Sequence, residues 1–401
     1  MTFKPETQSF ATEIEPLRNR DILCFSHDWT GDPLSKTHLM RVLSKDNRIL
    51  WVNAIANRMP TASSKDMSRI FKKLKSFTEP IKEVEPNIFV VNPLAVPAYG
   101  LSAAVTLNRS FLISQIKRAM KHLDFKRPVN MVFNPAAGMI AGKLGEDELI
   151  YYCVDEYTAF TGVSPGLRKI EEDLFRKADL VIVSADKLYE SKKQFNPNTF
   201  IIPHGVDYDH FRTALEEKTE IPSDLADLPK PIIGFHGLLA DWVDFELLKK
   251  VALHFWSGSM VLLGKVTVDA EQKIKVLRSI PNIHQLGRQP YADLPAYCKG
   301  FDVALNPFVI NELTESVNPL KVREYLAAGL PVVSTNIREM KNIGNCRVAN
   351  SHSEFIRMVE DALANPGSRS EISASMKNEG WEARVDKLRE IVQQAHNTKQ
   401  N

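Results

Sequence analysis

The chain alternates short apolar runs with longer amphipathic stretches along most of its length. In the first half the apolar runs predict buried strands, because each ends in polar or turn-forming residues. These predicted strands span residues 21–26, 48–53, 130–135, 149–155 and 178–186. Strands that alternate with helical patterns indicate a doubly wound parallel sheet. Helices are predicted through Leu39 and Leu43, near residues 136–144 and at residues 186–194.

A second set of strands and helices follows residues 213–231, a stretch rich in charge and proline that predicts a linker. The strands predicted here span residues 231–239, 259–266, 301–308 and 331–335. Helices are predicted at residues 244–255 and 269–278, and the alternation again predicts a parallel sheet.

The predicted architecture is therefore α/β, with two Rossmann-like parallel sheets in separate domains. Residues 1–212 are expected to form the first domain and residues 213–375 the second. Residues 376–401 are expected to form a C-terminal helix, since Trp381 and Val385 begin an apolar stripe at helical spacing.

Composition narrows the class of protein. Of the 401 residues, 44% are hydrophobic and 25% charged, which is typical of a globular protein. The net charge of +2 does not point to nucleic acid as a partner. The cysteines show no metal-ligand spacing and are interpreted as reduced core thiols. They are Cys24, Cys153, Cys298 and Cys346.

The first residues are polar and of mixed charge, without the apolar core of a signal peptide. No apolar run reaches the roughly 18 to 20 residues that a membrane-spanning helix requires. The expectation from these patterns is a cytoplasmic protein, either free in solution or attached to the inner face of the plasma membrane.

Residues 314–335 carry the strongest candidate chemistry. Pro319 favours the first turn of a helix, and backbone N–H groups at Asn318, Leu320 and Lys321 would then point out of its N-terminus. A helix N-terminus binds phosphate, and Lys321 adds a positive charge that opposes the helix dipole. Glu324, one turn later, could accept hydrogen bonds from two sugar hydroxyls. The alternative is an ordinary strand–helix–strand unit with a solvated lysine and glutamate.

Further candidates follow predicted strands, where ligands bind in doubly wound sheets. Gly237 would let the backbone approach a diphosphate closely, and Arg288 could neutralise its charge. Asp155 and Glu156 follow a strand of the first domain, and a carboxylate there can act as a general base. Asp155 is favoured because it comes first after the strand. Capping of the next segment is the alternative for both.

The pattern of residues 318–335, with Asn318, Lys321 and Glu324 before a buried strand, resembles the donor site of glycosyltransferases of the GT-B fold. It is closest to the branch that includes the xanthan-type glucuronosyltransferase and the teichuronic-acid glycosyltransferases. Many retaining members of the related family 4 have two glutamates eight positions apart. Here Glu324 fills the second position and Ser316 the first.

The resemblance implies two domains facing a cleft, with the final helix crossing back onto the first domain. It implies transfer of a sugar from a nucleotide-sugar, with UDP as the expected nucleotide. The acceptor would be a saccharide or a lipid-linked saccharide in exopolysaccharide or cell-envelope synthesis. It also assigns Asp155 as the base and places the loop after the first strand, with His27 and Asp28, on the acceptor side. Glu156, which follows the same strand as Asp155, is a further candidate for acceptor binding. Loop capping is the alternative for His27 and Asp28.

No Asp-x-Asp pair follows a strand, so the expected mechanism uses no metal or other cofactor. Lys321, Arg288 and the helix N-terminus would stabilise the departing diphosphate instead. Base catalysis by Asp155 implies inversion at the anomeric carbon.

Two basic amphipathic stretches, residues 65–82 and 108–127, would suit an anionic membrane surface. Helices that cover the sheet with a solvated basic face are the alternative. Two other functions also remain open at this point. One is a nucleotide-sugar epimerase of the same architecture, which needs no acceptor, and the other is a two-domain sugar-binding protein without turnover.

Overall fold

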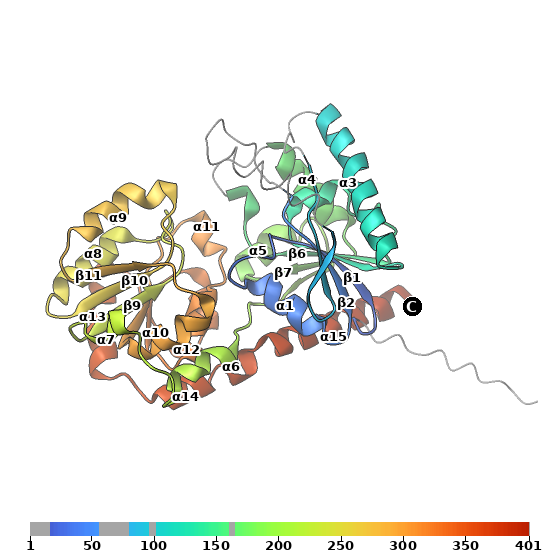
Figure 1. Ribbon diagram of the computed structural model, residues 1–401. Coiled ribbons are helices and arrows are strands. Elements are labelled where there is room, and N and C mark those ends of the chain that lie inside the picture. The colour runs from blue at the N-terminus through green and yellow to red at the C-terminus, as the bar shows by residue number, and fades with distance from the viewer. Residues whose placement is uncertain (1–16, 56–79, 96–101, 160–164, 401) are drawn as a thin grey trace, which may run out of the picture.

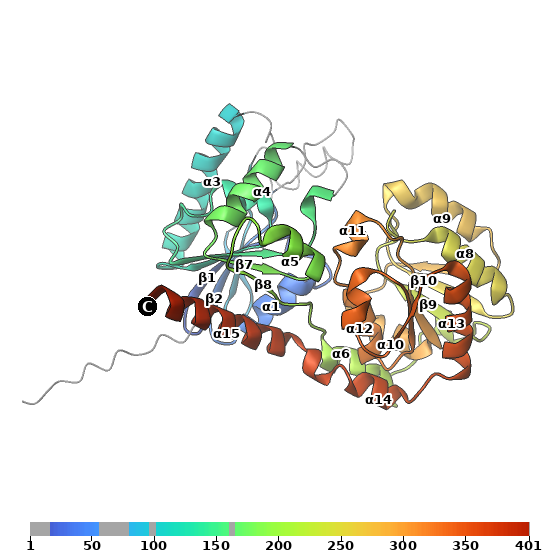
Figure 2. The ribbon, with the colours of Figure 1, turned by 180° about the vertical axis from the view of Figure 1, so that it is seen from behind.

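The computed structural model describes residues 17–55, 80–95, 102–159 and 165–400. Its two β-sheets form two neighbouring lobes (Figure 1). The last helix, α15 (Trp381–Gln400), leaves the second lobe and runs along the first, as the view from behind also shows (Figure 2). These features confirm the predicted α/β fold class.

The first sheet has the strand order β3-β4-β2-β1-β5-β6-β7-β8. Every neighbouring pair is parallel except β3 and β4, which are antiparallel. The strands are β1 (Asp21–Phe25), β2 (Arg48–Val52), β3 (Lys82–Glu85), β4 (Ile88–Val91), β5 (Val129–Val132), β6 (Glu148–Cys153), β7 (Leu180–Val183) and β8 (Thr199–Ile201).

Alternate residues of this sheet enter two different apolar clusters. Leu23 and Phe25 of β1 pack into one cluster, and Ile22 and Cys24 pack into the other. Side chains of a strand alternate between its two faces, so both faces of this sheet are covered. A sheet buried on both faces explains the nearly continuous apolar runs of the sequence.

The second sheet is parallel throughout, with the order β11-β10-β9-β12-β13-β14. Its strands are β9 (Ile232–His236), β10 (Ser259–Leu263), β11 (Ile283–Gly287), β12 (Val303–Asn306), β13 (Val332–Thr335) and β14 (Cys346–Ala349). The strand order reverses direction between β9 and β12, and such a switch point is where open α/β sheets bind ligands.

Helices connect the strands in both sheets. In the first domain they are α1 (Ser35–Leu43), α3 (Ser102–His122), α4 (Pro165–Lys177) and α5 (Asp186–Lys192). Short helices α6 (Tyr208–Phe211) and α7 (Ser223–Ala226) lie between the sheets in sequence. The remaining helices before α15 are α8 (Phe245–His254), α9 (Glu271–Arg278), α10 (Leu294–Gly300), α11 (Glu312–Glu315), α12 (Leu320–Ala327), α13 (His352–Ala364) and α14 (Arg369–Ala374).

Helix α15 joins the second domain to the first. Its residues Trp381, Val385 and Leu388 are buried in the same cluster as Ile22 and Trp51 of the first sheet. The apolar stripe of the sequence therefore packs against the first domain. The exact domain limits at residues 212 and 375 stay predictions.

Some predicted elements differ from those observed. Residues 136–144, expected to be a helix, form only the short 3₁₀ helix η1 (Pro135–Met139), because Gly138 and Gly142 weaken the helical propensity of this stretch. Strands β3 and β4 and helix α4 were not predicted. The first basic stretch, up to residue 79, lies outside the described residues. Among the described helices, none is both long and apolar enough to cross a membrane.

Candidate active site

A cavity of about 240 Å³ lies where the carboxyl ends of the two sheets face each other. The first domain contributes Asp155, which follows β6. The second domain contributes the loop after β9, the end of β12, the loop through α11 and the start of α12. Of the predicted residues, those that line this cavity are Asp155, Gly237, Asn318, Leu320 and Lys321.

Helix α12 begins at the cavity without a side-chain cap. Its N-cap is Pro319, which cannot accept a hydrogen bond through its side chain. The backbone N–H groups of the first turn therefore remain available to an anionic ligand. The Lys321 ammonium adds a positive charge in the same turn, and it makes no hydrogen bond or ion pair with any residue that the structure describes.

Gly237 gives the Lys321 side chain the space that it occupies. The φ angle of Gly237 is +150°, and a Cβ atom there would lie 2.9 Å from Cε of Lys321. Gly264, after β10, packs even more tightly, because its Cβ would lie 1.7 Å from the carbonyl oxygen of Gly237. Both positions therefore require glycine, and together they fix the backbone beside Lys321.

Glu324 lies one turn behind Lys321 and is only 5% exposed. It does not line the cavity. Its Oε2 atom lies 3.7 Å from Nε2 of His236. Burial lowers the pKa of His236 well below its usual range, so the ring is neutral and the contact is not an ion pair. Burial raises the pKa of Glu324, and the positive charge of Lys321 partly offsets that shift.

Asp155 carries the one carboxylate that lines the cavity in the described part of the chain. Burial raises its pKa, and the Coulomb interaction with Lys36 counteracts this shift. Lys36, from the first turn of α1, reaches the hydroxyl of Tyr157 at 3.5 Å. Tyr157 in turn donates to the carbonyl oxygen of Phe133 at 2.9 Å. Burial lowers the pKa of Lys36, and Asp155 counteracts that shift as well.

The residues predicted for the acceptor side are held by contacts within the first domain. His27 lies 3.1 Å from the hydroxyl of Ser26 and packs edge-on against Trp51. Its pKa is lowered to about 4, mainly by burial. Asp28 accepts a hydrogen bond from the backbone N–H of Ala54 at 3.1 Å. Neither residue lines the cavity.

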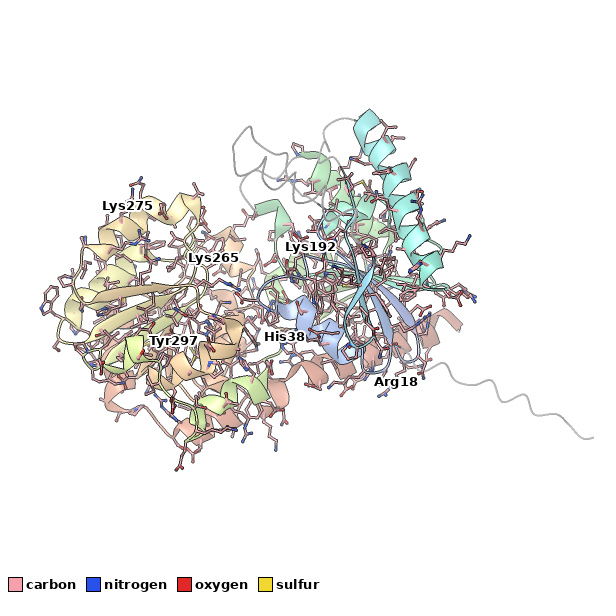
Figure 3. The ribbon with its side chains drawn as sticks, viewed as in Figure 1. Arg18, His38, Lys192, Lys265, Lys275 and Tyr297 are labelled. Atoms are coloured by element: carbon pink, nitrogen blue, oxygen red, sulfur yellow. The ribbon has the colours of Figure 1, made fainter. Side chains whose placement is uncertain are left out.

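Glu156 is buried and forms an ion pair with Lys192, at 2.6 Å between Oε2 and Nζ. The structure thus separates it from Asp155, which faces the cavity. Figure 3 labels Lys192 on the first domain. The role assigned to Glu156 on the acceptor side stays a prediction, and its observed contact is internal to the first domain.

Arg288 follows β11 and reaches across to the first domain. It forms a bidentate ion pair with Asp32, in the loop after β1, at 2.6 and 2.9 Å. Nearby, His38 of α1 stacks on Trp381 and approaches Tyr291 of the second domain. His38, labelled in Figure 3, lies where the two domains meet. Arg288 does not line the cavity, and its contact with a diphosphate stays a prediction.

Several residues of the site were not singled out in the sequence. Trp242 follows β9 and lines the cavity together with Leu238, Phe308 and Leu313. The sequence could have indicated Trp242 as a site residue, because this aromatic residue closely follows the predicted strand at residues 231–239. Lys36 offered no such signal, because only the packing of α1 onto the sheet brings it near Asp155.

The fold and the cavity define the protein as a member of the GT-B fold class: two Rossmann-like domains face each other across a site built from strand ends. Residues 230–365, most of the second domain, match the family described as Glycosyl transferases group 1. This match covers the β9 loop, β12 and α12, which supply most of the cavity wall. The predicted resemblance to GT-B glycosyltransferases is confirmed.

A curated relative is TuaH of Bacillus subtilis (strain 168), assigned to teichuronic acid biosynthesis as a glycosyltransferase. It is 26% identical over 216 residues, which cover 51% of this chain and 54% of TuaH. The chain thus matches about half the length of this relative.

Solved structures share the whole fold at low sequence identity. Sucrose-phosphate synthase from Thermosynechococcus elongatus matches with a TM-score of 0.68 at 14% identity, covering 95% of this chain and all of that one. HepE of Anabaena, in complex with UDP, matches with a TM-score of 0.64 at 12% identity, covering 94% of this chain and 100% of that one. At these identities the likeness establishes the fold alone.

Proposed function

We propose that this protein transfers a sugar from a nucleotide-sugar to a saccharide or lipid-linked acceptor in the synthesis of an exopolysaccharide or cell-envelope polysaccharide. The observation that carries the proposal is that Asp155 and Lys321, from different domains, line one cavity. One is a carboxylate and the other an ammonium group beside an uncapped helix N-terminus. The proposed transfer uses the carboxylate as the base and the ammonium group to stabilise the leaving diphosphate.

In the proposed reaction the diphosphate of the donor lies against Lys321 and the first turn of α12. The acceptor hydroxyl attacks the anomeric carbon while Asp155 removes its proton. The bond between the anomeric carbon and the phosphate oxygen breaks, and its electron pair leaves with the nucleoside diphosphate. Lys321 and the helix N–H groups stabilise that leaving charge, so no metal ion is required. Attack from the side of Asp155 inverts the anomeric configuration.

UDP is the proposed nucleotide. Among the structural neighbours, HepE is described in complexes with UDP and with UDP-glucose. Another, from Burkholderia xenovorans, is described as a UDP-forming α,α-trehalose-phosphate synthase. The proposal for a polysaccharide acceptor rests on the relative TuaH.

Contact with an anionic membrane surface is part of the proposal, since a lipid-linked acceptor would be met there. Helix α3 supports it. Its sequence contains basic residues and no acidic residue. Leu107 and Phe111, which lie one turn apart, are 73% and 46% exposed. An exposed apolar pair on a basic helix suits the interface of a lipid bilayer.

The proposed base can be tested by substitution. Asp155→Asn removes the proton acceptor and keeps the size of the side chain, so we expect transfer to fall by at least about 10²-fold. Affinity for the nucleotide should stay within about threefold of the wild type, because Asp155 does not contact the diphosphate in this mechanism. Glu172→Gln, which changes a partly exposed carboxylate of α4 away from the cavity, is the control and should retain transfer. Transfer that survives in Asp155→Asn would contradict the assignment.

A further inference from the structure

Most of the cavity wall is apolar. Five side chains form this surface, here called the apolar wall: Leu238, Trp242, Phe308, Leu313 and Val317. Phe308 is buried, whereas Leu238 is 41% exposed and Trp242 is partly exposed. Exposed apolar groups beside a binding site are ready to bury part of a ligand.

The polar side chains of the cavity are already committed to internal hydrogen bonds. Thr314 donates to the carbonyl oxygen of Val309 at 2.6 Å. The Asn318 side chain donates to Glu339 at 2.9 Å and accepts from Arg323 at 2.7 Å. Few side-chain groups therefore remain to bind the hydroxyls of a sugar.

Charge restricts the ligand further. Lys321 and Asp155 are the charged residues among those that line the cavity. Lys321 is assigned to the diphosphate, and Asp155 would repel a second carboxylate. A uronic acid bound here would bury its carboxylate without an arginine partner in the described part of the wall, which is costly.

The sugar must occupy this cavity, because its anomeric carbon lies between the diphosphate at Lys321 and the acceptor at Asp155. This step rests on the proposed function. We infer that the transferred sugar is uncharged and carries a methyl group, as a 6-deoxy sugar or an N-acetylamino sugar does. The methyl group packs on the apolar wall, with the Trp242 ring as its main contact.

Calorimetric titration tests the inference with ligands that differ in one substituent. UDP is titrated first, and then UDP-glucose, UDP-6-deoxyglucose, UDP-N-acetylglucosamine and UDP-glucuronic acid. If GDP, ADP or CMP binds in place of UDP, the same sugars are compared on that nucleotide. Burial of one methyl group predicts about fourfold tighter binding than for the glucose compound. The uronic acid should bind at least about tenfold more weakly than the glucose compound.

The 6-deoxy and N-acetyl compounds distinguish the two sources of the methyl group, and preference for either one supports the inference. Glucose or glucuronic acid as the tightest ligand would overturn it while UDP binding still upheld the donor site. Absence of binding by every nucleotide would overturn both the inference and the proposed function.

Variants of the wall separate the sugar contact from the nucleotide contact. Trp242→Ala should abolish the preference for the methyl-bearing sugar and leave affinity for UDP itself within about twofold. Trp256→Ala, which removes an exposed tryptophan on the second domain outside the cavity, is the matched control. Leu313→Ala gives a second, milder change if Trp242→Ala melts early in a thermal scan. A methyl preference that persists in both wall variants would contradict the inference.

Discussion

Asp155 is a carboxylate in a partly buried site, and its surroundings decide at which pH it can accept a proton. Burial raises its pKa, and the positive charge of Lys36 counteracts the shift. Lys36 is held near it by the hydroxyl of Tyr157, whose own backbone N–H donates to the Asp155 carbonyl oxygen at 3.0 Å. The base that we propose must be ionised to accept a proton, so in this proposal Lys36 extends the active range toward lower pH.

Lys36→Met is therefore expected to move the acidic limb of the pH profile. Loss of the cation raises the pKa of Asp155, so the pH at which kcat/KM is half-maximal should rise. Lys36→Arg keeps the charge and should retain most of the wild-type profile. The measurement is kcat/KM for transfer between pH 4 and 9. An unchanged acidic limb in Lys36→Met would refute the assigned interaction.

Glu171 offers a second test at the residue scale, away from the cavity. It is 3% exposed in α4, and its Oε1 atom accepts from the Tyr151 hydroxyl at 2.5 Å. Burial raises its pKa to about 7. The folded state thus holds a proton that the unfolded state releases near pH 4.5, so stability should fall as pH rises from about 4.5 to 7.

Glu171→Gln removes that dependence. At pH 8 we expect the variant to be more stable than the wild type by roughly 1–3 kcal/mol, and at pH 4 to be about equal. Glu172→Gln changes a much more exposed neighbour and should have little effect at either pH. Urea unfolding at both pH values is the measurement. Equal stability of the Glu171→Gln variant and the wild type at pH 8 would show that burial does not hold this carboxyl protonated.

At the scale of elements, helix α3 combines core packing with an exposed apolar pair. Leu112 and Ile116 are fully buried against the first sheet, whereas Leu107 and Phe111 face outward. One face of this basic helix therefore covers the sheet, and the opposite face leaves an apolar pair exposed. Leu112 and Ile116 cover the sheet. We propose membrane contact as the function of Leu107 and Phe111.

The double variant Leu107→Glu and Phe111→Glu should reduce binding to anionic lipid vesicles by about tenfold or more, because it removes apolar area and adds negative charge. Cosedimentation with vesicles of phosphatidylcholine and phosphatidylserine is the measurement. Val268→Glu, at an 83% exposed position of the second domain, is the control. No sedimentation of the wild type, or equal sedimentation of both variants, would count against membrane contact.

The parallel strands could be predicted because burial on both faces makes their sequences nearly continuous apolar runs. The start of α12 was predictable for a local reason, since Pro319 precedes the helical pattern. Strands β3 and β4 were missed because β3 is exposed at the sheet edge and its sequence, KEVE, is mostly charged. The contact between Lys36 and Tyr157 joins residues 121 positions apart, so only the packed fold brings them together.

At the scale of the whole molecule, the two domains are joined by α15 and by contacts across the cleft. Asn318 and Glu339 of the second domain form one such network, because Glu339 also accepts from the backbone N–H of Asp186 at 2.7 Å. The Arg288–Asp32 ion pair is another, and both of its side chains are about 40% exposed. Solvent screens an exposed pair of this kind and leaves it little net stabilising effect, so it does not prevent opening of the cleft.

The central claim is that the cavity binds the diphosphate of a nucleotide-sugar donor through Lys321 without a metal ion. Calorimetric titration of UDP, GDP, ADP and CMP, with and without EDTA, tests it most directly. The comparison uses the wild type, Lys321→Ala, and Lys275→Ala on the exposed surface of α9 as the control (Figure 3).

We expect one nucleotide to bind selectively in the micromolar range and EDTA to have no effect. Loss of a charge-assisted contact should weaken its binding to Lys321→Ala by about 10- to 100-fold and leave Lys275→Ala unchanged. Binding that requires a metal ion, equal affinity in Lys321→Ala, or no binding of any nucleotide would contradict the account.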